Sequence, residues 1–189
     1  MSSSSPTPKS GHSLVEYSTV FHTPEPQRLL EYWLEKRGER PRPRLSDFDL
    51  MALYKVAPVL TIRDLVNGGT DFRCRYWGTR LVDIFGVEPT GKLLSESFNP
   101  ESADILRDRL HMALAADGAL RVVTIVRLVD VTVPRTYEGI WLPLDGDQDE
   151  RQHTIGAFGF DYQIQDGELK RDGGPDDWRR ISYPTAPTA

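Results

Sequence analysis

Two runs of residues with a two-residue apolar period predict a β-hairpin in the first half of the chain. In the first run, 59–66, three apolar residues at even positions would share one side of a strand: Leu60, Ile62 and Val66. The second run, 72–77, carries on one parity Phe72, Cys74 and Tyr76. This period is that of half-buried strands, and Asn67-Gly68 between the runs tolerates the positive φ angles of a tight turn. The two runs should therefore pair as antiparallel strands.

Helical spacing follows the hairpin. Leu81 and Phe85 lie on one apolar stripe of a short helix, and Gly86 supplies its C-terminal stop. A longer helix should begin at Asn99, because Asn99-Pro100-Glu101 combines an N-cap, a proline in the first turn and an acid that complements the helix dipole. Its apolar stripe continues to about residue 116.

Three further β-rich runs, 120–128, 135–144 and 153–163, bring the number of predicted strands to five. In the last run Gly156 and Gly159 interrupt a strand pattern, which indicates a bulge or a place where another group approaches the backbone closely. The predicted fold class is α+β, with the helices inserted between the second and third strands.

The order of hairpin, short helix, glycine and then Gly91-Lys92 resembles the opening of a PAS domain. More narrowly, residues 72–94, FRCRYWGTRLVDIFGVEPTGKLL, resemble the stand-alone PAS-like proteins of bacteria. The resemblance extends over about Glu25 to Gln163. It implies a five-stranded antiparallel sheet with short helices on one face, preceded here by an N-terminal amphipathic helix. Many of those bacterial proteins have no assigned activity, so the resemblance implies a class of module and names no ligand.

The N-terminal amphipathic helix should run from about Glu25 to Gly38, with an apolar face that includes Leu29, Leu30 and Trp33. Such a stripe marks a buried face without naming its partner. The three side chains either pack on the sheet of the same chain or form an interface with a second subunit in a homodimer. A second short helix around Phe48 should follow, capped by Ser46 or Asp47.

The composition divides the chain into four parts. Residues 1–13 are rich in serine and proline and should form a disordered tail. Residues 14–57 hold an N-terminal arm and helices, residues 58–165 the PAS-like domain, and residues 166–189, rich in glycine, aspartate and proline, a flexible C-terminal tail.

Charge and cysteine usage narrow the classes of partner. The net charge of −5 disfavours nucleic-acid binding, which depends on cations that neutralise phosphates. No apolar run approaches the length that spans a bilayer, and the single cysteine suits a reducing compartment, so we expect a cytoplasmic protein without membrane contact. The basic segment Lys36–Arg44 is either a solvated linker or a site for a phosphate or a partner.

No catalytic or metal-binding constellation is evident. The segment Gly86–Leu93 matches most of a phosphate-binding loop, but Leu93 replaces the hydroxyl residue that would hold magnesium and Pro89 removes a backbone amide. The histidines show no paired spacing for a metal or for a nucleophile's base. The sequence therefore predicts no enzyme, no metal site and no named cofactor.

The remaining candidate site is the face of the sheet. PAS-like domains that bind small molecules do so between this face and the short helices, and the residues that could line such a pocket here are Phe72, Cys74, Tyr76, Val123, Ile125, Trp141 and Phe158. The same side chains could simply fill a core. The sequence favours a sensory or regulatory module that acts on a separate signalling protein, with a ligand-free scaffold domain, and more remotely a small-molecule enzyme, as alternatives.

Overall fold

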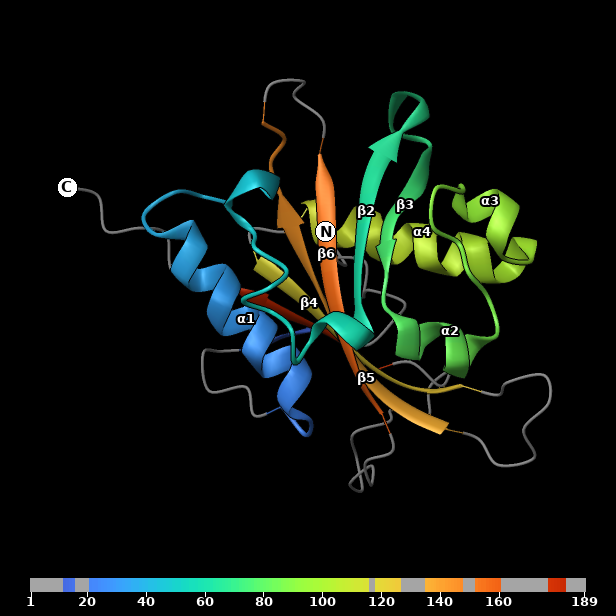
Figure 1. Ribbon diagram of the computed structural model, residues 1–189, viewed down its shortest axis with the longest axis horizontal. Coiled ribbons are helices and arrows are strands. Elements are labelled where there is room, and N and C mark those ends of the chain that lie inside the picture. Colours follow the sequence, from blue (N-terminus) through green and yellow to red (C-terminus); the bar gives the residue numbers. More distant parts are fainter. Residues whose placement is uncertain are drawn as a thin grey trace, which may run out of the picture.

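An antiparallel sheet forms the centre of the molecule, and helices cover both of its faces (Figure 1). The computed structural model describes residues 12–15, 21–115, 118–126, 135–147, 152–160 and 177–182. Five strands pair antiparallel in the order β4-β5-β6-β2-β3. Their bounds are Gly118–Val126 (β4), Arg135–Leu144 (β5), His153–Phe160 (β6), Leu60–Val66 (β2) and Asp71–Trp77 (β3). The predicted α+β fold with a five-stranded antiparallel sheet is confirmed.

The described helices divide between the two faces of this sheet. They are Pro24–Arg37 (α1), Thr79–Phe85 (α2), Leu94–Ser97 (α3) and Pro100–Ala115 (α4), with short 3-10 turns at Leu45–Asp47, Ala57–Val59 and Asn67–Gly69. Figure 1 shows α1 to one side of the sheet and α2, α3 and α4 to the other. We call the two sides the α1 face and the α4 face.

The turn, stop and cap residues predicted from the sequence occupy those roles in the structure. Asn67 and Gly68 have φ angles of 54° and 65°, as the hairpin turn requires. Gly86 ends α2 in the left-handed region, and its N–H donates to the carbonyl of Val82 at 2.8 Å. Asn99 caps α4, because its Oδ1 accepts the Ser102 N–H at 2.9 Å. These predicted boundaries are confirmed.

A β-bulge changes the predicted parity of the second strand. Ile62 pairs with Tyr76 but Arg63 pairs with Cys74, so Arg75 is an extra residue in β3. Trp77 consequently shares a face with Cys74, whereas Tyr76 lies on the opposite side of the sheet. The Tyr76 hydroxyl donates a hydrogen bond to the Ala57 carbonyl at 3.1 Å there.

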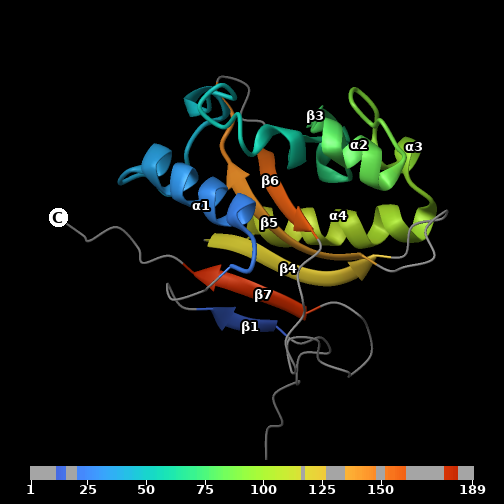
Figure 2. The same ribbon diagram turned by 60° about the horizontal axis from the view of Figure 1, so that its bottom comes forward.

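Two strands that the sequence pattern did not predict extend the sheet beyond β4 (Figure 2). Asp177–Ser182 (β7) pairs antiparallel with β4, and His12–Val15 (β1) pairs parallel with β7. Residues 177–182 of the predicted C-terminal tail and residues 12–13 of the predicted N-terminal tail thus form strands in the structure. The rest of both tails lies outside the described residues. A free sheet edge offers unpaired N–H and C=O groups to remote chain, which local composition does not reveal.

The short helix predicted around Phe48 does not form. Asp47 accepts the N–H of Arg44 at 2.7 Å and closes a 3-10 turn, and Asp49 accepts the N–H of Met51 at 2.8 Å. Side-chain acceptors of this kind compete with helical hydrogen bonds for the backbone. The segment therefore continues as turns with i→i+3 bonds, such as Leu53 N–H to the carbonyl of Leu50.

Helix α1 packs on the sheet of its own chain. Its apolar side chains Leu29, Leu30 and Trp33 are buried against β5 and β6. The Trp33 indole N–H also donates to the carbonyl of Pro143 at 2.9 Å. Of the two alternatives for this stripe, the structure adopts intramolecular packing, and these three side chains are not presented to a second subunit.

The start of α1 is tied to the sheet by a buried carboxylate. Glu138 of β5 is fully buried and accepts the N–H of His22 at 2.8 Å and both the N–H and the hydroxyl of Thr23 at 3.0 Å. Its other oxygen pairs with Arg121 of β4. A buried charge is tolerated only when it is paired and hydrogen-bonded, as here. Gly159 lies opposite Glu138 in β6 and leaves the space that Thr23 occupies.

Replacing Trp33 by alanine should lower the free energy of unfolding by about 3–5 kcal/mol, because the change empties a fully buried site and removes a hydrogen bond. The association state of the protein that remains folded should not change. Chemical denaturation and sedimentation velocity measure the two quantities. Tyr54→Ala, at an exposed ring, is the matched control and should be nearly neutral. Loss of a dimer at unchanged monomer stability would contradict the packing assigned to α1.

Replacing Gly159 by alanine should lower the free energy of unfolding by about 1–3 kcal/mol, because overpacking forces the surrounding structure to shift. The new Cβ would lie 1.8 Å from the Thr23 hydroxyl oxygen. In a Thr23→Gly background, which removes the clashing atoms, the same replacement should cost much less. A double-mutant cycle by denaturation measures the coupling. Equal costs in both backgrounds would refute the close approach as the cause.

Candidate functional site

The strand register assembles one continuous set of side chains on the α4 face. Trp77, Thr61, Gly156 and Trp141 form one row across β3, β2, β6 and β5, since cross-strand partners share a face. The next row in the same direction begins with Cys74 and Arg63. Helix α4 contacts this face through Arg109, which donates to the Tyr137 hydroxyl at 3.0 Å, and through His111, whose ring lies 5.0 Å from that of Phe72.

Aromatic rings cover the part of this face that lies below α2. Phe85, the last residue of α2, has its ring centroid between 5.9 and 6.5 Å from those of four sheet residues: Trp77, Tyr137, Phe158 and Phe160. Two glycines let the larger rings lie against the sheet. A Cβ at Gly156 would be 2.9 Å from Trp141, and one at Gly139 would be 3.1 Å from Phe158. The two glycines of the last strand are therefore places where a side chain lies close to the backbone: Trp141 at Gly156 on the α4 face and Thr23 at Gly159 on the α1 face.

Arg63 brings a positive charge into the middle of this apolar surface. Its residue is 1% exposed, and its guanidinium lies 5.2 Å from the ring centre of Trp77 and 5.8 Å from that of Phe98. Burial lowers the pKa of Arg63 to about 10, so the group is still protonated at neutral pH. Contact with aromatic faces offsets roughly 0.5–2 kcal/mol of the cost of burying a cation.

None of the guanidinium nitrogens of Arg63 has a hydrogen-bond partner among the described residues. Three more buried polar atoms on the same face also have no hydrogen-bond partner among the described residues: the indole nitrogens of Trp77 and Trp141 and the hydroxyl of Thr61. We call Thr61, Arg63, Trp77 and Trp141 the donor cluster. Each buried, unsatisfied polar group costs about 1–3 kcal/mol, and a charged one costs more. A concentration of such groups at one place therefore requires an explanation.

The nearest acidic groups form no direct contact with Arg63, although the charge of Asp71 partly offsets the effect of burial on the pKa of Arg63. Asp71 is occupied by its neighbours, since one carboxylate oxygen accepts the Phe72 N–H at 2.8 Å and the other accepts the Ser95 hydroxyl at 2.7 Å. Burial raises the pKa of the Cys74 thiol, which keeps it neutral, and this thiol donates to the carbonyl of Tyr76 at 3.4 Å. In the described part of the chain no carboxylate forms an ion pair with Arg63.

The structure gathers only some of the predicted pocket residues. Phe72, Cys74, Trp141 and Phe158 lie on the α4 face and are buried. Tyr76 lies on the α1 face because of the bulge. Val123 and Ile125 of β4 pair with Glu138 and Thr136, which alternate with the residues of β5 that face α4. The register therefore does not place them with Trp141, and their side chains are not among those that the structure describes.

Sequence reasoning did not identify Arg63, Trp77 or Phe85 as residues of this site. The signal that could have found Arg63 is an arginine at the centre of an apolar strand, on the parity that pairs with Cys74. The bulge hid this parity for Trp77. Phe85 was assigned only to the stripe of its short helix, and its place over the sheet depends on how α2 is docked.

The segment with the phosphate-loop pattern is used to hold the edge of the sheet. Gly91 donates its N–H to the carbonyl of Cys74 at 2.7 Å, and Cys74 donates its own N–H to the carbonyl of Lys92 at 2.9 Å. Leu93 forms a bridge with Arg73. The Gly91 amide is therefore engaged in pairing with β3, and the Lys92 N–H donates to the carbonyl of Pro89 at 2.9 Å, so neither is available to a phosphate.

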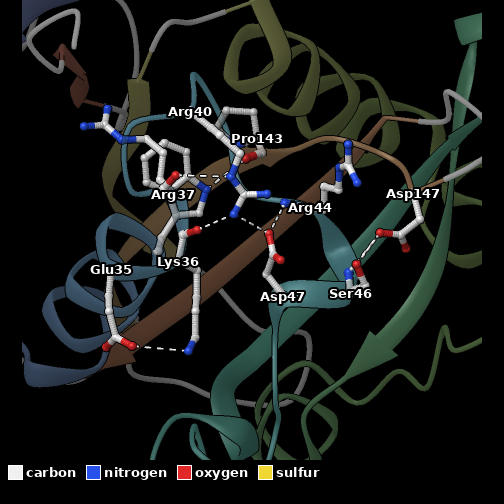
Figure 3. A network of polar contacts seen from close by, with 10 residues as sticks. Glu35, Lys36, Arg37, Arg40, Arg44, Ser46, Asp47, Pro143 and Asp147 are labelled. Atoms are coloured by element: carbon white, nitrogen blue, oxygen red, sulfur yellow. Dashed lines mark hydrogen bonds and ion pairs between the residues drawn. The ribbon is translucent and has the colours of Figure 1, made fainter. Parts of the chain in front are cut away.

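The basic segment Lys36–Arg44 is largely occupied by internal partners (Figure 3). Arg40 pairs with Asp47 at 2.7 Å and donates to the carbonyl of Lys36 at 2.6 Å. Lys36 pairs with Glu35 at 3.2 Å, and Arg42 donates to the carbonyl of Leu114 at 2.6 Å. These contacts support a structural role for the segment.

Other candidate sites are few. Asp64 accepts both nitrogens of the Arg75 fork at 2.8 Å and contacts His153 Nδ1 at 2.8 Å. Burial alone would raise the pKa of Asp64, but the hydrogen bonds with His153 and Arg75 lower it below its usual value. A surface pocket of about 290 Å³ lies between α1 and residues 52–56 and shares no residue with the donor cluster.

The described ranges hold neither a metal-binding cluster nor a membrane-spanning helix. No group of three or more histidine, cysteine, aspartate or glutamate side chains there could hold a metal ion. No helix among the same residues is both long and apolar enough to cross a bilayer.

Comparison with solved structures shows several similar chains. The VqmA dimer of Vibrio cholerae, solved in the absence of its target DNA, matches with 16% identity and a TM-score of 0.46 over 65% of this chain and 53% of that one. The PAS domain of Bordetella pertussis BvgS matches with 17% identity and a TM-score of 0.42, over 62% of this chain and 90% of that domain. A fungal LOV domain photoreceptor matches with 14% identity and a TM-score of 0.40, over 61% and 93%.

These likenesses are too distant to carry an argument about function, and the aligned part spans about half of the VqmA chain. The search of curated proteins found no match. The family model described as PAS domain, by contrast, matches residues 21–159. That range holds α1, the antiparallel core of the sheet and all the helices of the α4 face. Because the match covers well over half of the 189 residues, the chain belongs to the PAS domain family.

Proposed function

We propose that this protein is a non-catalytic sensory or regulatory module that binds a small molecule between the α4 face and helices α2–α4. Membership of the PAS domain family supports a sensory or regulatory role in general. The observation that supports a ligand is the donor cluster, a group of buried hydrogen-bond donors under these helices that have no acceptor among the described residues. A bound molecule that supplies acceptors would remove the cost of burying them.

The attachment of α2 indicates where a ligand would change the structure. The start of the helix is fixed, because Gly78 donates to the carbonyl of Leu60 at 2.9 Å and has no room for a Cβ against the backbone of Pro58. Its end carries Phe85, which is only partly buried. A ligand next to Arg63 would displace Phe85 and Phe98, the two rings over the cluster, and so shift the segment from α2 to the start of α4.

The change would reach a separate signalling protein through the opposite face. Strands β5 and β6 carry Trp141 and Phe158 on the α4 face and contact α1 on the other. Helix α1, through the side chains that face away from the sheet, is the part of the surface that we assign to the partner. A homodimer and a cytoplasmic location complete the proposal.

One observation favours the alternative of a ligand-free interaction domain. The ring of Phe85 already packs against four aromatic residues of the sheet, as in a filled core. A scaffold of this kind would bind its partner without a small molecule. Hydrogen exchange in its α2–α3 segment would then be unchanged by the metabolites of a cell extract.

Native mass spectrometry of the full chain, purified from cells and then exposed to a metabolite extract, separates the two functions. We expect a mass increment that is lost on denaturation, because the donor cluster retains its ligand. Hydrogen exchange should show added protection over 79–98 and in α1 relative to protein stripped by unfolding and refolding. A bare mass after every extract, with unchanged exchange, would establish the ligand-free alternative.

A further inference from the structure

We propose that the ligand of the donor cluster is a small monocarboxylate with an apolar body, and that its carboxylate binds the guanidinium of Arg63. This inference rests on the proposed ligand site and specifies its chemistry. It is drawn from the kind of atoms that the cluster presents, from the charge that it carries and from the side chains around it.

The cluster presents donors almost exclusively. Arginine has five N–H groups and no acceptor, and an indole has one N–H and no acceptor. Arg63, Trp77 and Trp141 therefore require acceptor atoms opposite them, and the Thr61 hydroxyl can serve either way. A ligand that complements the cluster must be rich in acceptors at the end that faces Arg63. This requirement excludes amines and other cations.

The charge of the site favours a monoanion. No described carboxylate forms an ion pair or hydrogen bond with Arg63, and Asp71, whose charge acts on Arg63 from a distance, already accepts hydrogen bonds from Phe72 and Ser95. One carboxylate would neutralise the guanidinium by direct contact, and its two oxygens match the guanidinium fork. A phosphate dianion would leave an excess negative charge in a poorly hydrated place, which is costly. A neutral acceptor would leave the cation uncompensated.

The surroundings of the cluster require an apolar body behind the carboxylate. The guanidinium lies 5.2 Å from the ring centre of Trp77 and 5.8 Å from that of Phe98, and these two rings are themselves neighbours. Phe85, which also packs on Trp77, and Phe158 extend this apolar surface. Phe85 and Phe98 are the partly buried rings among these, and they stand at the ends of the short helices α2 and α3. A flat or aliphatic body would pack between these rings as they move, and would keep water from the ion pair.

The test uses the full chain and defined probes: benzoate, phenylacetate and hexanoate, with benzamide as the neutral counterpart of benzoate and inorganic phosphate as the competing anion. Isothermal titration calorimetry and thermal unfolding should show binding of at least one carboxylate, and none of benzamide. Arg63→Lys should weaken that binding by about tenfold or more, since a lysine keeps the charge but loses the fork.

A second variant separates a binding role from a structural one. Arg63→Met should abolish carboxylate binding and leave the free protein as stable as the parent or more stable, because it removes an unpaired buried charge. Arg80→Met, at an exposed arginine on α2, should change neither quantity. If Arg63→Met instead lowers the melting temperature and no probe binds, the arginine is satisfied by ordered water alone and the inference is overturned.

The remaining outcomes distinguish this inference from the proposed function. If phosphate binds through Arg63 as tightly as a carboxylate does, the inference that the ligand is a monoanion is wrong. Failure of all the carboxylates, with a neutral molecule retained in native mass spectrometry, would overturn the inference and leave the ligand-binding function intact. Failure of the carboxylates with a bare native mass would overturn both.

Discussion

The register of the central strands decides which side chains the sheet presents to its helices. One extra residue in β3, Arg75, moves Trp77 to the side of Phe72 and Cys74 and sets Cys74 opposite Arg63. A shift of one residue reverses every side chain beyond it, so this bulge determines the composition of both faces at that edge. The bulge thereby adds the Trp77 indole to the α4 face, whereas Arg63 and Trp141 reach the same face through the registers of β2, β6 and β5.

The two faces of the sheet differ in how they treat buried polar groups. On the α1 face, Glu138 is paired with Arg121 and accepts hydrogen bonds from the start of α1, so its charge is compensated within the chain. On the α4 face, the guanidinium of Arg63 contacts the rings of Trp77 and Phe98 and has no hydrogen-bonded partner among the described residues. The paired charge of Glu138 holds the start of α1 on the sheet. The guanidinium of Arg63 is buried without a hydrogen-bonded partner, and a ligand that supplied acceptors would remove that cost and bind more tightly as a result.

Local patterns were sufficient for the elements of the core. The alternation over 59–66, the Asn67-Gly68 turn, the glycine after Phe85 and the cap at Asn99 each describe interactions within a few residues, and each is found where it was predicted. The same reasoning failed around Phe48, where the side chains of Asp47 and Asp49 bind nearby N–H groups and replace a helix by turns. It also missed β7 and β1, since their partners are remote in sequence.

The sequence by itself determined the α+β class, the five core strands and the family resemblance, because period, turn and cap signals act over short distances along the chain. It also indicated which side chains are apolar enough to be buried on the sheet. Only the tertiary structure decided which face each of them joins, that α1 covers its own sheet, and that Arg63 is enclosed by aromatic rings. These depend on a bulge and on packing between remote segments, and no pattern of neighbouring residues specifies either.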